Sequence, residues 1–261
     1  MSILLTGFLL FSSSLLNTKP SPIFTDVYIG AHGPYRFLVD TGAQTSLIDP
    51  KLAADLGLQP EFRVEVITQN SARLLPGTRV GLLRIGPRTL AGVELVFHDV
   101  GEARRLDASV KGLLGMNALT GFNFTLAPPA NRLDFASERP AGETVPFTLI
   151  EGRISLKGRM GAESLTLILD SGSSHMVLFH TPDAMARTAP VSTTFGTFDG
   201  ARSVAPTCWT AEMFFTDRLR VGMLPAAIVQ RKGTQEDGLL PASVFKKIYV
   251  DQDRRELVLT R

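Results

Sequence analysis

The chain has 261 residues, of which 44% are hydrophobic and 20% are charged, and this composition is typical of a folded protein rather than a disordered one. The net charge is +2, and Lys and Arg gather in nothing longer than pairs, so we expect no nucleic acid as a partner. A single cysteine, Cys208, excludes an intramolecular disulfide. The four scattered histidines match no ligand spacing, so we expect neither a metal nor a cofactor.

Residues 1–22 form an apolar N-terminal segment whose role has two interpretations. The run Ile3 to Leu16 is too short to span a bilayer comfortably and suits the apolar region of a secretory signal or anchor. Basic residues before it and a clear cleavage site after it are missing. A signal predicts an extracytoplasmic protein that is periplasmic, secreted or membrane-associated. The alternative is an N-terminal strand packed onto the body of a cytoplasmic protein.

Short apolar runs follow at roughly ten-residue spacing, separated by Gly, Pro, Asn or Asp, as in an all-β protein. The clearest expected strands are Val27 to Ile29, Phe37 to Val39, Val64 to Ile67, Val80 to Ile85 and Val93 to Phe97.

Helices are expected to be few and short. The best candidate is Pro50 to Leu56, which has Asp49 as a possible N-cap, proline in its first turn and Gly57 after its end. Weaker candidates are Ala242 to Lys247 and Thr181 to Arg187.

An internal repeat is the most informative feature. Three apolar residues, an aspartate, a small hydroxyl residue and a glycine occur at Phe37 to Gly42 and again 130 residues later at Leu167 to Gly172. Downstream, the motif Gly112-Leu113-Leu114-Gly115 has a counterpart in Gly238-Leu239-Leu240-Pro241. Because both motifs recur in the same order at nearly the same spacing, the sequence indicates a duplication.

Each repeat places an aspartate after an apolar strand, where the chain turns sharply. Glycine permits the turn and lets backbone N–H groups approach the carboxylate. Two such carboxylates brought together cannot both ionise, so they share one proton. One member is then a base and the other an acid at the same pH, which suits activation of a water against an amide carbonyl.

These motifs resemble those of the aspartic peptidases, and in particular of the retropepsin-like bacterial aspartyl proteases. The resemblance implies that Asp40 and Asp170 are the catalytic pair. It also implies active-site loop support from the residues that follow each aspartate, namely Thr41, Gly42, Ser171, Gly172 and Ser173. Two departures stand out: Ala43 occupies the position of Ser173 in the first copy, and Pro241 replaces the glycine expected after Leu240.

The resemblance further implies an all-β, bilobal acid-protease fold, in which two similar retropepsin-like β-barrel lobes flank an interlobe cleft that holds the active site. We expect a first lobe at residues 23–145 and a second at 146–261. The partner would be a peptide or protein substrate, bound by a monomer that is an intramolecular pseudo-dimer.

Flaps over the cleft are expected at Thr68 to Thr78 and at Phe195 to Arg202, although ordinary hairpin ends would have the same pattern. The substrate-binding residues expected there are Asn70, Ser71, Ala72 and Phe198. Trp209, the only tryptophan, is expected in the core or between the lobes rather than as a substrate platform.

Three functional alternatives remain at this point. The chain is an aspartic endopeptidase, or it keeps the fold as a non-catalytic peptide-binding or scaffold module. In the third alternative, each half pairs with its equivalent in another chain and a dimer has two sites. The presence of both aspartates favours catalysis.

Overall fold

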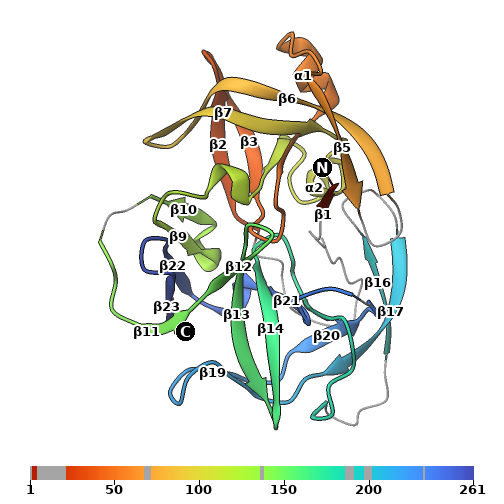
Figure 1. The fold of residues 1–261 in the computed structure, drawn as a ribbon, viewed down its shortest axis with the longest axis vertical. Helices are drawn as coiled ribbons and strands as arrows, with labels where there is room; N and C mark the ends of the chain where they lie inside the picture. Colours follow the sequence, from red (N-terminus) through yellow and green to blue (C-terminus); the bar gives the residue numbers. More distant parts are fainter. Residues whose placement is uncertain are drawn as a thin grey trace.

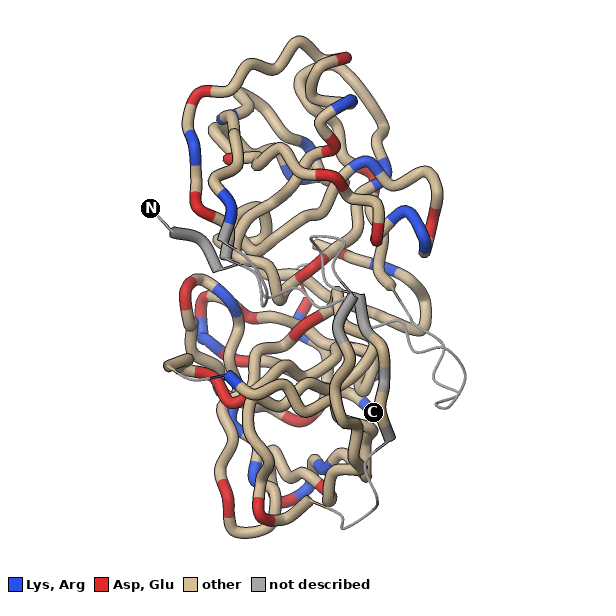
Figure 2. The backbone as a smooth tube through the Cα atoms, turned by 90° about the vertical axis from the view of Figure 1, so that its right-hand side faces the viewer, with Lys and Arg blue, Asp and Glu red and all other residues tan. Residues whose placement is uncertain are grey.

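The computed structural model describes residues 2–4, 22–67, 72–135, 138–185, 191–196, 202–231 and 233–261. Most of them lie in strands arranged as two lobes, which are stacked along the longest axis of the molecule (Figures 1 and 2). Acidic and basic residues are interspersed over both lobes (Figure 2).

The first lobe is built on one eight-stranded sheet with the order β1-β5-β6-β2-β3-β8-β4-β7. Because β6 also pairs with β7, six of these strands close into a barrel. The strands are β1 Ser2–Leu4, β2 Phe24–Ile29, β3 His32–Val39, β4 Ser46–Ile48, β5 Phe62–Ile67, β6 Ala72–Ile85, β7 Arg88–Phe97 and β8 Val110–Leu114.

The second lobe is an open sheet with the order β16-β17-β20-β15-β21-β14-β13-β18-β19, and β12 pairs with β13. Its strands are β12 Thr148–Ile150, β13 Arg153–Met160, β14 Glu163–Asp170, β15 Met176–Leu178, β16 Val191–Gly196, β17 Arg202–Trp209, β18 Met213–Phe214, β19 Arg220–Val221, β20 Pro225–Ile228 and β21 Gly238–Pro241.

The two lobes repeat one topology. In the first, β8 runs parallel to β3 and antiparallel to β4, and β4 runs parallel to β7. In the second, β21 runs parallel to β14 and antiparallel to β15, and β15 runs parallel to β20. The hairpins β5/β6 and β16/β17 occupy equivalent places. The duplication read from the motifs is therefore a duplication of the fold.

A third, five-stranded sheet joins the halves, with the order β10-β9-β22-β23-β11 (Figure 1). Its strands are β9 Phe124–Ala127, β10 Arg132–Asp134, β11 Glu143–Pro146, β22 Lys247–Asp251 and β23 Glu256–Thr260. Because each half contributes a hairpin to this one sheet, its pairing holds the two lobes together.

Three apolar clusters form the core. The largest includes buried residues of both halves and of the shared sheet. A second cluster contains Leu38 and Ala43 of the first lobe, and a third contains Ile168 and Phe179 of the second. The residue two positions before each aspartate, Leu38 or Ile168, thus anchors the aspartate loop in its own lobe.

The expected strands are present, but only one of the three expected helices forms. Helix α1 spans Pro50–Asp55, and the Asp49 side chain caps it by accepting hydrogen bonds from the backbone N–H groups of Lys51 and Leu52. Residues 242–247 contain only the 3₁₀ turn η3, Ala242–Val244, because the chain enters β22 at Lys247. Residues 181–185 form no helix, and residues 186–187 lie outside the described part of the chain. The remaining short helical elements are α2 Gly101–Arg104, η1 Met116–Ala118 and η2 Pro128–Ala130.

At the N-terminus, β1 pairs in parallel with β5 from Ser2↔Glu65 to Leu4↔Ile67. These three residues therefore pair with the first lobe as a strand. Residues 5–21, which hold most of the apolar run, lie outside the described residues.

Candidate active site

Asp40 and Asp170 are brought together by two equivalent loops. Asp40 directly follows β3, and Asp170 is the last residue of β14. Each aspartate therefore lies at the end of an internal strand that has a parallel neighbour, β8 or β21. The two side chains are essentially buried, with exposed fractions of 1% and 0%. Both loops therefore place a carboxyl group inside the protein at the junction of the lobes.

Thr41 and Ser171 lock the two loops together through a reciprocal set of hydrogen bonds. The Thr41 hydroxyl donates to the carbonyl of Leu169 (2.7 Å), and the Ser171 hydroxyl donates to the carbonyl of Val39 (2.8 Å). Each hydroxyl oxygen also accepts a hydrogen bond from the backbone of the other loop. The Thr41 N–H donates to Ser171 Oγ, and the Ser171 N–H donates to Thr41 Oγ1, both at 3.1 Å. The loop-support role expected of these hydroxyls corresponds to four interlobe hydrogen bonds.

This lock supports a prediction about stability. Thr41→Val and Ser171→Ala each leave buried backbone groups without a partner, so we expect each to lower the free energy of unfolding by about 1–3 kcal/mol. Because the two side chains share one network, the double variant should lose less than the sum of the two losses. Urea unfolding measures this, with Thr148→Val on the exposed end of β12 as a control. Equal losses in the control and in the site variants would contradict the lock.

Backbone N–H groups hold each carboxylate in the same way. Oδ1 of Asp40 accepts from Gly42 (2.9 Å) and Ala43 (3.2 Å). Oδ1 of Asp170 accepts from Gly172 (2.8 Å) and Ser173 (3.0 Å). The second oxygen of Asp170, Oδ2, is buried and receives no backbone hydrogen bond from the described residues. Each aspartate thus has one oxygen fixed by its own loop, which leaves the other for chemistry.

Glycine is required after each hydroxyl residue because the opposite carboxyl group lies against it. A Cβ on Gly42 would lie 2.5 Å from Cγ of Asp170, and a Cβ on Gly172 would lie 2.6 Å from Cγ of Asp40. These reciprocal contacts show how closely the two aspartates approach each other across the lobes.

The two aspartates differ in their affinity for a proton. Burial raises the pKa of Asp40 to about 6, against the lowering effect of hydrogen bonds from the Asp170 side chain and from the backbone of Gly42 and Ala43. Burial and then the negative charge of Asp40 raise the pKa of Asp170 well above its usual value. Because both pKa values are raised and the two groups interact, the pair has a singly protonated form in which one aspartate carries the charge and the other the proton.

The two departures from the repeat leave the site intact. The Ser173 hydroxyl donates to the carbonyl of His175 within its own loop (2.6 Å), so alanine at position 43 removes no hydrogen bond to a carboxylate. Pro241 lies within β21 and pairs with Asp170 in the parallel register. Its lack of an N–H therefore does not prevent the strand from passing beneath the second loop.

The described parts of the two predicted flap segments belong to the antiparallel hairpins β5/β6 and β16/β17, on the right-hand side of Figure 1. Ala72 is the first residue of β6, so this strand begins earlier than the expected Val80. Asn70, Ser71 and Phe198 lie outside the described residues. The first hairpin packs on the cluster that contains Leu38 through four side chains, those of Phe62, Val64, Val66 and Leu75. The second hairpin packs on the cluster that contains Ile168 through Ala205. This packing connects the hairpins to the aspartate loops.

Trp209 corrects an expectation. It is 42% exposed at the end of β17, where it pairs with Pro225 near the edge of the second lobe. The prediction of a core position is wrong, because a large apolar residue was assumed to be buried, although many such residues remain partly exposed.

Sequence reasoning missed a buried cation beside the site. The Arg153 side chain is fully buried, and its guanidinium donates to Glu151 Oε2 (3.0 Å) and to Glu236 Oε1 (3.3 Å). The position 130 residues earlier is Ile23, which is also fully buried. Comparing the two repeats position by position would have revealed this charged residue in place of an apolar one.

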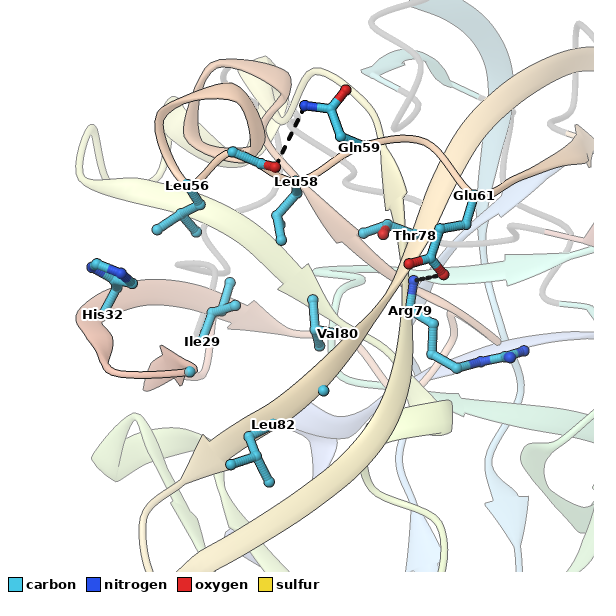
Figure 3. A pocket seen from close by; sticks show the side chains of 13 residues that line it. Ile29, His32, Leu56, Leu58, Gln59, Glu61, Thr78, Arg79, Val80 and Leu82 are labelled. Carbon is cyan, nitrogen blue, oxygen red and sulfur yellow. Dashed lines mark hydrogen bonds between the residues drawn. The ribbon is translucent and has the colours of Figure 1, made fainter.

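A separate groove of about 520 Å³ lies on the first lobe (Figure 3). It is lined by apolar side chains, including Leu56, Leu58, Val80 and Leu82, with Glu61 accepting a hydrogen bond from the Arg79 backbone. None of its lining residues belongs to the two aspartate loops. This groove is therefore separate from the two aspartate loops.

Among the described residues, no group of His, Cys, Asp or Glu side chains is arranged to hold a metal ion. Within the same part of the chain, no helix is long and apolar enough to cross a membrane.

A duplicated β fold with an interlocked aspartate loop in each half is the bilobal fold of aspartic proteases. Residues 25–118, which include Asp40, match the family model of aspartyl proteases. This match to the first repeat agrees with the resemblance that the motifs indicated. Among solved structures, it is similar to basic 7S globulin from soybean, with 11% identity, a TM-score of 0.46 and 92% of each chain covered. The comparison with curated proteins gave no match.

Proposed function

We propose that the protein is an aspartic endopeptidase that hydrolyses peptide bonds with water activated between Asp40 and Asp170. The observation that carries this proposal is the pair itself: two buried carboxyl groups that meet across the lobes, both with a raised pKa, so that the pair can hold one proton. A module that only binds peptides has no need for two costly buried acids.

In the proposed reaction, ionised Asp40 accepts a proton from the water while the water oxygen attacks the scissile carbonyl carbon. Protonated Asp170 donates its proton to the carbonyl oxygen, and a neutral tetrahedral diol results. Asp40 then gives its proton to the amide nitrogen, one diol hydroxyl returns a proton to Asp170, and the C–N bond breaks. Acid and amine products leave the pair in its starting state.

The substrate would be an extended segment of a peptide or protein. Both hairpins pack on the apolar clusters that anchor the aspartate loops, and each has an exposed apolar residue, Leu74 or Val204. Backbone hydrogen bonds to such strands bind extended peptides. Because the two acids of one chain meet each other, a monomer would have one complete site, and we propose that the protein acts in this form.

The pKa shifts predict the pH dependence of this activity. Activity requires ionised Asp40, so kcat/KM should fall on the acidic side with an apparent pKa near 6. It also requires protonated Asp170, whose pKa is raised, so activity should fall again at higher pH. A pH–rate profile for one peptide measures both limbs. A maximum near pH 3, or activity that stays unchanged well above neutral pH, would contradict this assignment.

The test of the proposed function is cleavage of a proteome-derived peptide library by the purified protein, with Asp40→Asn as the matched control. We expect cleavage products with the unmodified protein and none with the variant. If the folded protein binds peptides without cleaving them over the whole pH range, the chain is a binding module and the proposal is wrong.

A further inference from the structure

The groove drawn in Figure 3 lies at a gap along one edge of β6. Strand β5 pairs with β6 from Ala72 to Gly77, and β2 pairs with it from Leu83 to Ile85. Both lie on the same edge of β6, because β7 pairs with the other edge from Gly77 to Ile85. Residues 78–82 therefore have a strand partner on one side only within the described part of the chain, and all five line the groove.

Backbone hydrogen bonds close the two ends of this gap. At one end, the N–H of Gly30 donates to the carbonyl of Leu82 (2.9 Å). At the other end, the N–H of Glu61 donates to the carbonyl of Gly77 (2.8 Å), and Oε2 of Glu61 accepts from the N–H of Arg79 (3.1 Å). The groove between them has about 520 Å³, within the range of about 300–1,000 Å³ that is usual for ligand pockets. A strand edge that lacks a partner binds an extended chain through backbone hydrogen bonds.

The second lobe does not repeat this uninterrupted strand. There, β17 ends at Trp209 and β18 begins at Met213, and β18 pairs with β13 as the last part of β6 pairs with β2. Residues 210–212, which lie between them, correspond to 80–82 by the repeat offset of 130. The duplicated fold therefore does not itself require a continuous strand along the gap.

The side chains along the gap are mostly apolar. Leu58 and Val80 point toward each other across it, and Ile29 lies beside them (Figure 3). Leu82 also lines the groove and is 53% exposed, so a bound segment could cover its apolar surface. Because successive side chains of an extended chain alternate between two faces, every second residue of that segment would meet these side chains. The lining therefore favours a segment in which apolar residues alternate with others.

One end of the groove carries a negative charge. The Arg79 side chain extends away from the groove and pairs with Glu94 (2.6 Å), which leaves Glu61 as the charged group at the end where β5 begins (Figure 3). Since β2 and β5 both run antiparallel to β6, a strand that continues their direction through the gap would end beside Glu61. A lysine or arginine as its last residue would complement this charge.

We propose that this groove is a second peptide-binding site, which takes an extended segment of another protein as a strand between β2 and β5. The segment has alternating apolar residues and ends in a lysine or arginine. A small apolar molecule would leave both the strand edge and Glu61 without a partner. None of the lining residues belongs to the aspartate loops, so the inference is independent of the proposed peptidase activity.

The first measurement is fluorescence anisotropy with the probe Val-Thr-Val-Thr-Val-Lys, which carries fluorescein at its amino end and an amide at its carboxyl end. The full chain carries Asp40→Asn, so that the probe stays intact. We expect binding that Leu58→Ser weakens about 10-fold or more, because a leucine-sized apolar contact is lost. The control Met223→Ser makes a similar change at an exposed apolar residue of the second lobe and should leave the affinity unchanged.

The second measurement exchanges charges between the protein and the probe. A probe that ends in glutamate should bind about 2- to 5-fold more weakly than the lysine probe, and Glu61→Lys should reverse this order. Glu61→Gln, which can still accept from the Arg79 N–H, should bind both probes equally. The control Glu212→Gln, in the second lobe, should keep the original order. A general loss of stability cannot produce a reversal, since each variant is compared with both probes.

No binding of the lysine probe by the folded protein would overturn the inference. Binding that Leu58→Ser leaves unchanged would place the probe at another site, and an order of the two probes that Glu61→Lys does not alter would refute the role of the charge; either result overturns it. Dimerisation of the protein alone that Leu58→Ser abolishes would show that a second copy occupies the groove, and it would overturn the inference as well. Because only binding is scored, failure of the peptide-cleavage test leaves these results unaffected.

Discussion

Replacing Asp40 or Asp170 with asparagine should lower peptide hydrolysis by about 10³-fold or more, because each variant removes either the base or the acid of the reaction. Asparagine can still accept the backbone hydrogen bonds that Oδ1 accepts now, from Gly42 and Ala43 in one loop and from Gly172 and Ser173 in the other. The loss should therefore occur in kcat, with the loop geometry kept. Steady-state kinetics on one cleaved peptide measures it.

The same variants should be more stable than the unmodified protein at neutral pH. A carboxyl group whose pKa is raised on folding favours the folded state below its unfolded pKa and loses that contribution as pH rises through the folded value. For Asp40 this range runs from about 3.8 to about 6. At pH 7 a neutral asparagine avoids the cost, and we expect a gain on the order of 1–3 kcal/mol in urea unfolding. A loss of stability together with activity would show that the carboxylates serve the fold.

Gly42→Ala and Gly172→Ala should each abolish detectable activity. The added Cβ would lie within 2.6 Å of the opposite aspartate's Cγ, so one carboxyl group must leave its position. A misplacement of about 1 Å at reacting groups lowers the rate by about 10²-fold, and this clash forces a displacement of at least that size. Steady-state kinetics and urea unfolding, measured together, separate the loss of activity from any loss of stability.

The matched control for this pair is Gly222→Ala. No heavy atom lies within 4 Å of a Cβ at that position, and the backbone there does not require glycine. We expect unchanged activity and stability in this variant. Full activity in Gly42→Ala would mean that the two aspartates do not need the observed approach, which would contradict the proposed dyad.

The duplication and the two loops were predictable because both depend on local sequence. Each aspartate loop needs an apolar strand before it and a glycine where the opposite carboxyl group lies against the backbone. Both features can be read from residues 37–42 and 167–172. The presence of the expected strands was predictable for the same reason, but not their bounds, since β6 begins at Ala72 and not at Val80. Helix α1 was predictable because its cap, Asp49, is adjacent to it in sequence.

Features that depend on distant residues were not predictable from the sequence. The expected helix at residues 242–247 does not form because the chain there enters β22, which pairs with β9 of the other half. Trp209 is exposed because its strand ends at the rim of the sheet. The ion pair of Arg153 with Glu236 joins residues 83 positions apart, so neither residue alone indicated a charge beside the aspartates.

Mixing inactive Asp40→Asn with inactive Asp170→Asn tests most directly whether one chain builds one complete site. The account predicts that the unmodified chain cleaves peptide, that each variant does not, and that an equimolar mixture remains inactive. Recovery of activity in the mixture would show that aspartates from two chains form the site, and it would contradict the intramolecular pair.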